Sequence, residues 1–218
     1  MRYIIANWKM NLNLADITAW FESFRQSLPL IPENKEIIIA ASAPYLGLLS
    51  VLTKTKNLKL SAQDASSLET GAHTGEVGAF QLKDFCAYAL VGHSERNENI
   101  EVSLKKRDVC LANGITPIFC FSNISDVESV YKTGVILTWE DPANISKGGQ
   151  YRAKPKEEIQ SGIDKIRQKI PADAILIYGG SVNRQNIIDL ANIKGLNGVL
   201  PGNASKDPIH FAELVLKF

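Results

Sequence analysis

Eight short apolar runs along this chain of 218 residues are the feature that most constrains its fold. The runs are continuous rather than alternating, which is typical of parallel strands buried on both faces. They predict strands at Tyr3–Ala6, Ile37–Ala41, Leu58–Ser61, Ala87–Val91, Ile115–Phe119, Val135–Thr138, Ile175–Tyr178 and Gly198–Leu200. Because parallel strands are joined by long crossovers, usually helices, this order indicates an α/β protein with one parallel sheet.

Helical patterns fill several of the connecting segments. Apolar residues recur at three- and four-residue spacing from Ala15 to Leu28 and from Lys156 to Ile170, which predicts a helix in each segment. The segment from Asn123 to Gly134, between the fifth and sixth strands, is much shorter. It has room for about two helical turns within Ser125–Tyr131, since a turn takes about 3.6 residues. The fifth helix is therefore predicted to be truncated.

Two architectures accommodate eight such units, an open doubly wound sheet and a closed (β/α)8 barrel. An open sheet binds its ligand at one switch point, usually beside a glycine-rich turn after the first strand. Here the first strand runs into Asn7-Trp8-Lys9-Met10-Asn11, and polar candidate residues follow strands one, four, six, seven and eight. Such a distribution favours the closed barrel, whose active sites lie at the C-terminal ends of the strands. With no linker or repeat, residues 1–218 are expected to form one domain.

Charge and cysteine content narrow the class of protein. The net charge is +1 without a basic stripe, so neither nucleic acid nor a membrane surface is expected as a partner. Cys86, Cys110 and Cys120 lie in apolar surroundings without metal-like spacing, which predicts buried free thiols and a cytoplasmic location. No secretion signal or membrane span is expected from the apolar runs. Three scattered histidines, without paired carboxylates or thiols nearby, make a poor case for a metal site.

Two strand ends deliver groups suited to acid–base catalysis. Glu140 follows the sixth strand and precedes a long polar segment from Asp141 to Gln150, which is typical of a lid over an active site. Burial beneath a lid would raise the basicity of this carboxylate. His93 follows the fourth strand and is followed by Ser94-Glu95. This position favours an acid–base or electrophilic role over that of a core histidine.

A cation and an anion-binding turn are predicted at the same rim. Lys9 follows the first strand between two large apolar residues, Trp8 and Met10, and is expected to face an anionic ligand rather than solvent. The segments from Tyr178 to Asn183 and from Gly198 to Ser205 place small residues at a strand end just before a helix is expected. Backbone N–H groups and the helix dipole at such a place bind phosphate.

Taken together, these segments resemble the triosephosphate isomerase family, from Tyr3 to the C-terminus. The resemblance is carried by Asn7-Trp8-Lys9-Met10-Asn11, Gly71-Ala72-His73-Thr74-Gly75-Glu76-Val77, Gly92-His93-Ser94-Glu95-Arg96 and Tyr178-Gly179-Gly180-Ser181-Val182. It implies a TIM barrel that interconverts dihydroxyacetone phosphate and D-glyceraldehyde 3-phosphate in glycolysis and gluconeogenesis. It also implies that no cofactor or metal takes part.

The resemblance further implies roles for individual residues. Glu140 would move a proton between two substrate carbons while neutral His93 polarises the carbonyl group. Lys9 would stabilise developing negative charge, and Glu95 would bond within the network of Lys9 and His93. The substrate-binding set would be Asn7, Lys9, Ser146, Gly180, Ser181, Gly202 and Asn203.

In this family the loop after the third strand inserts into a partner subunit, so the resemblance implies a homodimer. Thr74 would contact the second subunit, and Glu76 with Arg96 would form an accompanying ion pair. A tetramer is the alternative, because the shortened fifth helix is similar to that of compact archaeal members.

The chain departs from the family pattern at several points. Asp141-Pro142 follows Glu140 where the family has a proline directly, the lid lacks the usual tryptophan, and Asn203 replaces the second glycine of a Gly-Gly pair. Two alternatives therefore stay open: a different phosphosugar enzyme on the same barrel, and a non-catalytic phosphate-binding or scaffolding barrel. The presence of Lys9, His93 and Glu140 weighs against the second.

Overall fold

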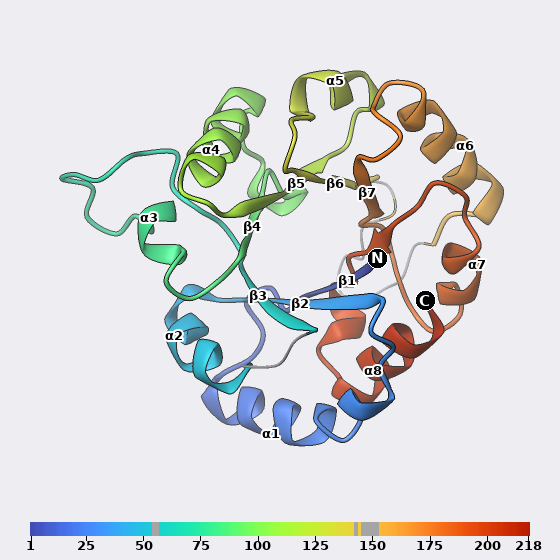
Figure 1. Ribbon diagram of the computed structural model, residues 1–218, viewed down its shortest axis with the longest axis horizontal. Coiled ribbons are helices and arrows are strands. Elements are labelled where there is room, and N and C mark those ends of the chain that lie inside the picture. The colour runs from blue at the N-terminus through green and yellow to red at the C-terminus, as the bar shows by residue number, and fades with distance from the viewer. Residues whose placement is uncertain (54–56, 142–143, 145–152) are drawn as a thin grey trace.

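The computed structural model describes residues 1–53, 57–141, 144 and 153–218. Its eight parallel strands form a closed barrel in chain order, with helices arranged around it (Figure 1). The strands are β1 (Arg2–Asn7), β2 (Lys35–Ala41), β3 (Leu58–Ala62), β4 (Tyr88–Val91), β5 (Thr116–Phe121), β6 (Ile136–Trp139), β7 (Ile175–Tyr178) and β8 (Gly198–Val199). The closed barrel is confirmed over the open sheet, and all eight predicted strands are present.

The barrel closes through its shortest strand. β8 pairs with β1 at Tyr3–Gly198 and Ile4–Val199, and with β7 on its other side. A Cβ atom at Gly198 would lie 2.3 Å from the carbonyl oxygen of Tyr3, so a glycine is needed for this close approach. The interior is filled by a cluster of buried apolar residues: Ile5, Ile38, Ala40, Leu90, Ile118, Cys120, Ile136, Ile177 and Leu200. The ring is thus a packed core that holds its rim rigidly.

The helices lie outside the barrel, and the longer ones bury an apolar side against it (Figure 1). They are α1 (Leu14–Phe24), α2 (Ala43–Leu52), α3 (Ala79–Leu82), α4 (Ile100–Ala112), α5 (Val127–Val130), α6 (Lys156–Arg167), α7 (Ile187–Ala191) and α8 (Pro208–Lys217). Short 3-10 turns are η1 (Leu28–Leu30), η2 (Ser94–Arg96), η3 (Ile124–Asp126) and η5 (Asn203–Ser205). In the described part of the chain, no helix is both long and apolar enough to span a bilayer.

Both helices predicted from apolar spacing end earlier than expected. α1 ends at Phe24 and α6 ends at Arg167, before the predicted ends at Leu28 and Ile170. The cause is a proline beyond each helix, at positions 29 and 171. A proline ring clashes with the carbonyl group four residues earlier, so α-helical hydrogen bonding stops about one turn before the proline.

The predicted truncation of the fifth helix is confirmed. Between β5 and β6 the chain forms η3 and then the short α5. Arg107, a buried residue of α4, donates hydrogen bonds of 2.7 and 3.0 Å to the carbonyl oxygens of Ser129 and Val130. These carbonyls lie at the C-terminal end of α5, where no further helical turn satisfies them. A side chain from the neighbouring helix thus replaces the missing turn.

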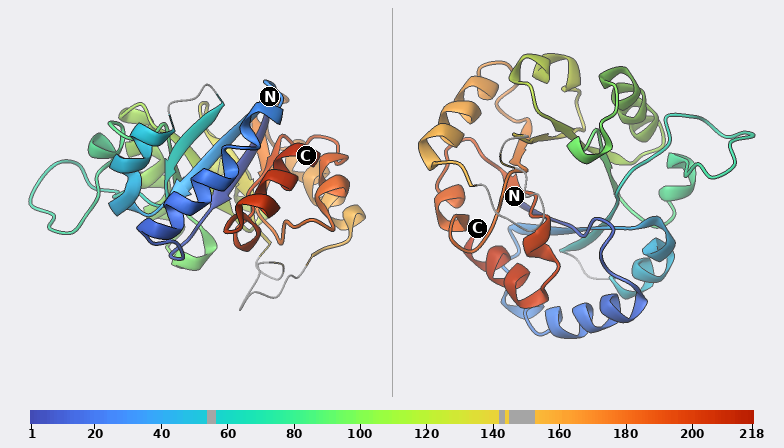
Figure 2. Two further views of the ribbon diagram at one scale, coloured as in Figure 1. Left: turned by 90° about the horizontal axis from the view of Figure 1, so that it is seen from below. Right: turned by 180° about the vertical axis from the view of Figure 1, so that it is seen from behind.

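One segment projects from the ring. Residues 63–78, between β3 and α3, extend away from the barrel when it is viewed along its axis and from the side (Figures 1 and 2). Thr74 and Glu76 are exposed in this segment. Long loops that leave a rigid scaffold are commonly functional.

All three cysteines are free and buried, as predicted. Burial raises the pKa of Cys86 to about 11 and that of Cys110 to about 12. Burial, and secondly the charge of Glu140, raises the pKa of Cys120. Because the thiolate is the reactive form, all three should react slowly with a thiol reagent in the folded protein. Titration with a chromogenic disulfide should give three fast equivalents after unfolding in guanidinium and none in the native protein; fast native labelling would contradict the described burial.

Candidate active site

Three side chains from different strand ends meet at one rim of the barrel. Lys9 follows β1, His93 follows β4 and Glu140 follows β6. They enclose a space of about 20 Å³, whose other walls are Gly179, Gly180, Ser181, Val182, Leu200, Gly202 and Asn203. The convergence follows from topology, because the carboxyl ends of all parallel strands lie at the same rim. The structure therefore brings together the carboxylate, imidazole and ammonium groups that the sequence places far apart.

Glu140 is held in place by its backbone and by both carboxylate oxygens. Its side chain is buried, with the residue 1% exposed. The Oε1 atom lies 3.2 Å from Nε2 of His93, and Oε2 accepts a hydrogen bond of 3.0 Å from the backbone N–H of Ser94. The backbone N–H of Glu140 donates to the carbonyl of Phe121 at 2.8 Å, which ties it to β5. A buried carboxylate with an adjacent imidazole is suited to accept and return a proton.

The hydrogen bonds of His93 define its tautomer. The backbone N–H of Glu95 donates to Nδ1 of His93 at 3.2 Å, so Nδ1 acts as an acceptor and carries no proton. The ring proton then resides on Nε2, which faces Oε1 of Glu140. His93 is therefore a neutral imidazole with its N–H directed into the site. Such a group polarises a carbonyl oxygen by donating a hydrogen bond to it.

Lys9 joins this network through Glu95. The ammonium group of Lys9 forms an ion pair with Oε1 of Glu95, while Oε2 of Glu95 lies 3.9 Å from Nδ1 of His93. Asn7 is buried, and its Oδ1 atom accepts a hydrogen bond of 3.0 Å from the backbone N–H of Lys9. Met10 does not confine Lys9 as expected from the sequence, because Met10 is 95% exposed. The residue pair Lys9–Glu95, rather than an apolar wall, sets the position of the ammonium group.

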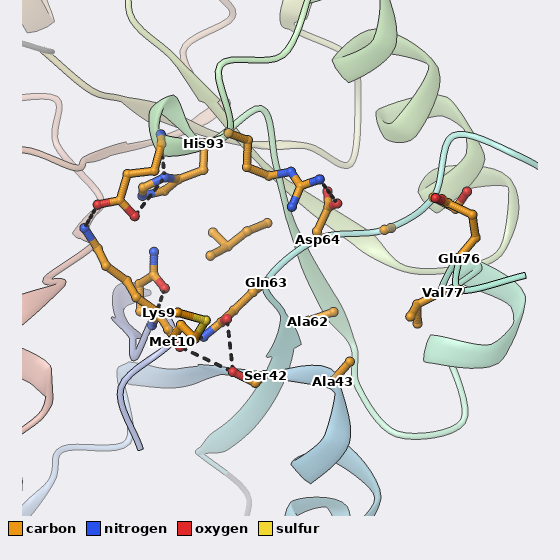
Figure 3. A pocket seen from close by; sticks show the side chains of 17 residues that line it. Lys9, Met10, Ser42, Ala43, Ala62, Gln63, Asp64, Glu76, Val77 and His93 are labelled. Atoms are coloured by element: carbon orange, nitrogen blue, oxygen red, sulfur yellow. Dashed lines mark hydrogen bonds and ion pairs between the residues drawn. The ribbon is translucent and has the colours of Figure 1, made fainter. Parts of the chain in front are cut away.

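Sequence reasoning missed Gln63, at the end of β3. Its side-chain amide donates hydrogen bonds of 2.9 Å to the carbonyl oxygens of both Lys9 and Ala40. Ser42 lies beside it, with Oγ 3.4 Å from the Lys9 carbonyl oxygen (Figure 3). Gln63 follows a strand end, as Lys9 and His93 do, but a neutral amide in a long loop gives no chemical signal in the sequence. Its contacts, 54 residues away in the chain, become visible in the folded protein.

The glycines of the rim leave room for the side chains of Glu140, Tyr178 and Lys9. A Cβ atom at Gly179 would lie 2.9 Å from Cγ of Glu140, and one at Gly180 would lie 2.1 Å from the hydroxyl oxygen of Tyr178. A Cβ atom at Gly202 would lie 3.0 Å from Cε of Lys9. Contacts under about 3 Å force neighbouring atoms to move, so a larger residue at Gly179 or Gly202 would press on Glu140 or Lys9, and one at Gly180 would displace Tyr178. Gly180, Ser181, Gly202 and Asn203, the predicted anion-binding residues, thus share walls with Glu140 and Lys9.

The two anion-binding turns differ from the prediction in one respect. After β8, η5 begins at Asn203, close to the strand end as expected. After β7, however, α7 begins at Ile187, and Asn183 instead organises a turn by accepting a hydrogen bond of 2.8 Å from the N–H of Gln185. No helix dipole therefore acts on Ser181 from its own segment. The predicted substrate residue Ser146, and most of the predicted lid, lie outside the described residues.

A larger cavity of about 620 Å³ adjoins the site on the side of β2 and β3. Figure 3 shows Lys9 and His93 on one side of it and Glu76 on the other. Arg96, which also lines it, pairs within the chain with Asp64 at 2.9 Å and with Glu98 at 2.6 Å. Arg96 is thus fixed before any second molecule binds.

The two carboxylates beside Arg96 are also held by a buried lysine. Lys106 lies 2.7 Å from Asp64 and 2.6 Å from Glu98. Burial raises the pKa of Asp64 despite these cations. Burial also raises the pKa of Glu98, but the hydrogen bonds from Lys106 and Arg96 outweigh this effect and hold its pKa below the ordinary value. Asp64 and Arg96, which line the cavity, are therefore part of a charged network that extends to Glu98 and Lys106.

Trp139, next to Glu140, packs on a glycine of α6. A Cβ atom at Gly162 would lie 2.2 Å from Cη2 of the Trp139 ring. We expect Gly162→Ala to lower the free energy of unfolding by about 1–3 kcal/mol, as overpacking does, and to lower kcat by displacing Glu140. Urea unfolding and steady-state kinetics would measure both.

Gly47→Ala is the matched control, since Gly47 also lies within a helix but a Cβ there meets Phe85 at an ordinary 3.6 Å. It should raise stability by up to about 1 kcal/mol. Equal effects of the two changes would show that the packing on Trp139 is unimportant.

Among the described residues, no group of three or more His, Cys, Asp and Glu side chains is arranged to hold a metal ion. The site presents a carboxylate, an imidazole and an ammonium group to the space between them. A closed parallel barrel with these groups at its C-terminal rim defines a (β/α)8 barrel enzyme equipped for acid–base catalysis.

Residues 2–218 match the family model of triosephosphate isomerase. The chain belongs to the triosephosphate isomerase family and is an isomerase.

Relatives from three bacteria, each named triosephosphate isomerase, are similar to this chain over nearly its whole length. The protein of Aquifex aeolicus (strain VF5) is 31% identical, covering 100% of this chain and 99% of its own. The protein of Mesomycoplasma hyopneumoniae (strain 7448) is 30% identical, covering 99% of this chain and 98% of its own. The protein of Mycobacterium bovis (strain ATCC BAA-935 / AF2122/97) is 32% identical, covering 97% of this chain and 94% of its own.

Proposed function

We propose that this protein interconverts dihydroxyacetone phosphate and D-glyceraldehyde 3-phosphate through an enediolate, in glycolysis and gluconeogenesis. The observation that carries the proposal is the buried carboxylate of Glu140, 3.2 Å from the Nε2 atom of a neutral His93. The relatives named triosephosphate isomerase support the choice of substrate.

The proton transfer uses Glu140 in both directions. Its carboxylate removes a proton from C1 of dihydroxyacetone phosphate, a C1–C2 double bond forms, and the electron pair of the C2 carbonyl moves to oxygen. Glu140 then returns the proton to C2, while a proton moves from the C1 oxygen to the C2 oxygen and C1 becomes the aldehyde. Nothing is oxidised or reduced overall. The same carboxylate serves as base and then as acid.

His93 and Lys9 stabilise the negative charge that develops on oxygen. The Nε2–H group of His93, now directed at Glu140, donates to the substrate carbonyl when substrate binds. In this step the Glu140 carboxylate gives up its contact with His93, so that the Nε2–H group can face the substrate. Lys9 adds a fixed positive charge where the enediolate forms.

The rest of the proposed substrate site is the rim around these groups. Asn7 orients the substrate beside Lys9, and Glu95 keeps Lys9 and His93 in one network. The backbone around Gly180, Ser181, Gly202 and Asn203 holds the phosphate.

A coupled isomerase assay with each triose phosphate tests the proposal. Turnover in both directions, with tight competitive inhibition by 2-phosphoglycolate as an enediolate mimic, is the expected result. Turnover of another phosphosugar instead, without tight binding of 2-phosphoglycolate, would favour the second enzyme hypothesis. Phosphate binding without any turnover would favour the scaffolding hypothesis.

We further propose that the protein acts in the cytoplasm as a homodimer, with a tetramer as the alternative. In the proposed dimer the tip of the projecting segment, around Thr74, enters the cavity of about 620 Å³ in the other subunit and covers Met10, which is 95% exposed in the single chain. In this arrangement Thr74 contacts the second subunit, and Glu76 approaches Arg96 across the interface. Light scattering at micromolar concentration should give at least twice the 24.0 kDa chain mass; a monomer would oppose it.

A further inference from the structure

The catalytic lysine has an unfavourable backbone conformation. Lys9 and Asn97 are the non-glycine residues of the described part of the chain with positive φ, at 52° and 51°. For residues with a Cβ atom this left-handed region costs free energy, and asparagine tolerates it better than lysine. Such a conformation persists where the surrounding structure holds it, and it clusters at functional sites. The contacts of the Lys9 backbone therefore set the point from which its side chain reaches Glu95.

Both peptide groups of Lys9 are fixed by side chains from neighbouring elements. On the N-terminal side, its N–H donates to Oδ1 of Asn7 at 3.0 Å. On the C-terminal side, its carbonyl oxygen accepts from Nε2 of Gln63 at 2.9 Å, with Oγ of Ser42 at 3.4 Å. Gln63 also donates to the carbonyl of Ala40, the penultimate residue of β2, at 2.9 Å. One amide thus fastens the turn after β1 to the end of β2.

We propose that Gln63 is a positioning residue, whose amide group holds Lys9 in its left-handed conformation and thereby holds the ammonium group in the active site. Both amide hydrogens are used by backbone carbonyls, so Gln63 acts through Lys9 and not on the substrate. The ammonium group has little freedom to compensate, because Lys9 is paired with Glu95 and packs on Gly202. The kinetic part of this inference rests on the proposed triose phosphate isomerisation.

Gln63→Met tests the proposal, because methionine has a similar length and shape but no donor. We expect kcat/KM to fall about a hundredfold, as for a catalytic group displaced by about 1 Å. In the Lys9→Met background the same change should cost less than about twofold, because no ammonium group is left to position. Additive losses in the double variant, or wild-type kinetics of Gln63→Met, would overturn the proposal.

A second variant and a matched control separate positioning from general stability. Gln63→Glu has the same length but presents a carboxylate to two carbonyl oxygens, and should lose at least as much activity as Gln63→Met. Gln160→Met is the control: the Gln160 amide also donates to two acceptors, Asp164 and the Lys194 carbonyl, but on α6. It should leave kcat/KM unchanged, with folded fraction and oligomeric mass checked for every variant.

A readout that does not depend on activity completes the test. In a crystal structure of Gln63→Met, φ of Lys9 should leave the positive region, or its ammonium group should separate from Glu95. A wild-type Lys9 geometry in that structure would refute the positioning role, whatever the substrate. If wild-type enzyme does not isomerise triose phosphates but Lys9 moves in this variant, the proposed function fails and the positioning role stands.

Discussion

Glu140→Gln is expected to lower kcat for triose phosphate isomerisation by about a thousandfold, within the range typical of a lost general base. Glutamine preserves the volume of the side chain, but its single carbonyl oxygen cannot face both the N–H of Ser94 and the Nε2–H of His93, as the two carboxylate oxygens do. It has no carboxylate to take a proton, and its amide must meet the Nε2–H of His93 through oxygen. Steady-state kinetics of the purified variant would measure the loss.

Two further variants make the result specific. Glu140→Asp keeps the carboxylate but withdraws it by one methylene, so kcat should fall by about a hundredfold, less than for glutamine. Glu128→Gln is the matched control, because Glu128 is an exposed residue paired with Lys169 far from the rim. It should have wild-type kinetics. Wild-type turnover of Glu140→Gln would remove the proposed base and the mechanism with it.

Lys9→Met is expected to lower kcat/KM by about 10²–10³-fold, the effect of removing one preorganised charge from a developing oxyanion. Methionine retains most of the apolar stem and removes the ammonium group. The partner carboxylate of Glu95 has a side chain 49% exposed, so water solvates it after the change. A half-exposed ion pair contributes under about 1 kcal/mol, and the free energy of unfolding should change by no more than that.

Lys9→Arg is the informative comparison for this prediction. It keeps the positive charge and the bond to Glu95, but the broader guanidinium group must occupy a space that Gly202 leaves for a narrow side chain. Its activity should lie between that of wild type and Lys9→Met. If Lys9→Met retained wild-type kcat/KM, the charge would have no part in the reaction, and the inference about Gln63 would lose its kinetic basis.

The strands were predictable because their signal is local. A parallel strand buried on both faces must be continuously apolar, and the eight runs match the eight strands to within two residues at either end. The short fifth helix was predictable from chain length alone. The ends of the helices were less predictable, because apolar spacing shows only which residues face the core. Pro29 and Pro171 end the α-helical hydrogen bonding about one turn before the proline itself.

The meeting of Lys9, His93 and Glu140 at one rim was also predictable from the chain, because each residue directly or closely follows a strand. The environment of each residue was not. The expected apolar confinement of Lys9 by Met10 was wrong, since the turn after β1 directs Met10 into solvent. The expected helix start directly after β7 was wrong as well, because Asn183 stabilises a turn before α7.

The amino-acid sequence by itself determined which segments form strands, which form helices, and which polar residues lie at the ends of strands. What only the tertiary structure decided is contact between segments far apart in the chain. The closed ring places Glu140 on His93 and Ser94, 46 residues from the latter, and places Gln63 on the strained backbone of Lys9. These contacts depend on the register and closure of all eight strands. A hydrogen bond of about 3 Å forms only when the whole barrel brings donor and acceptor together, so no local run of residues predicts it.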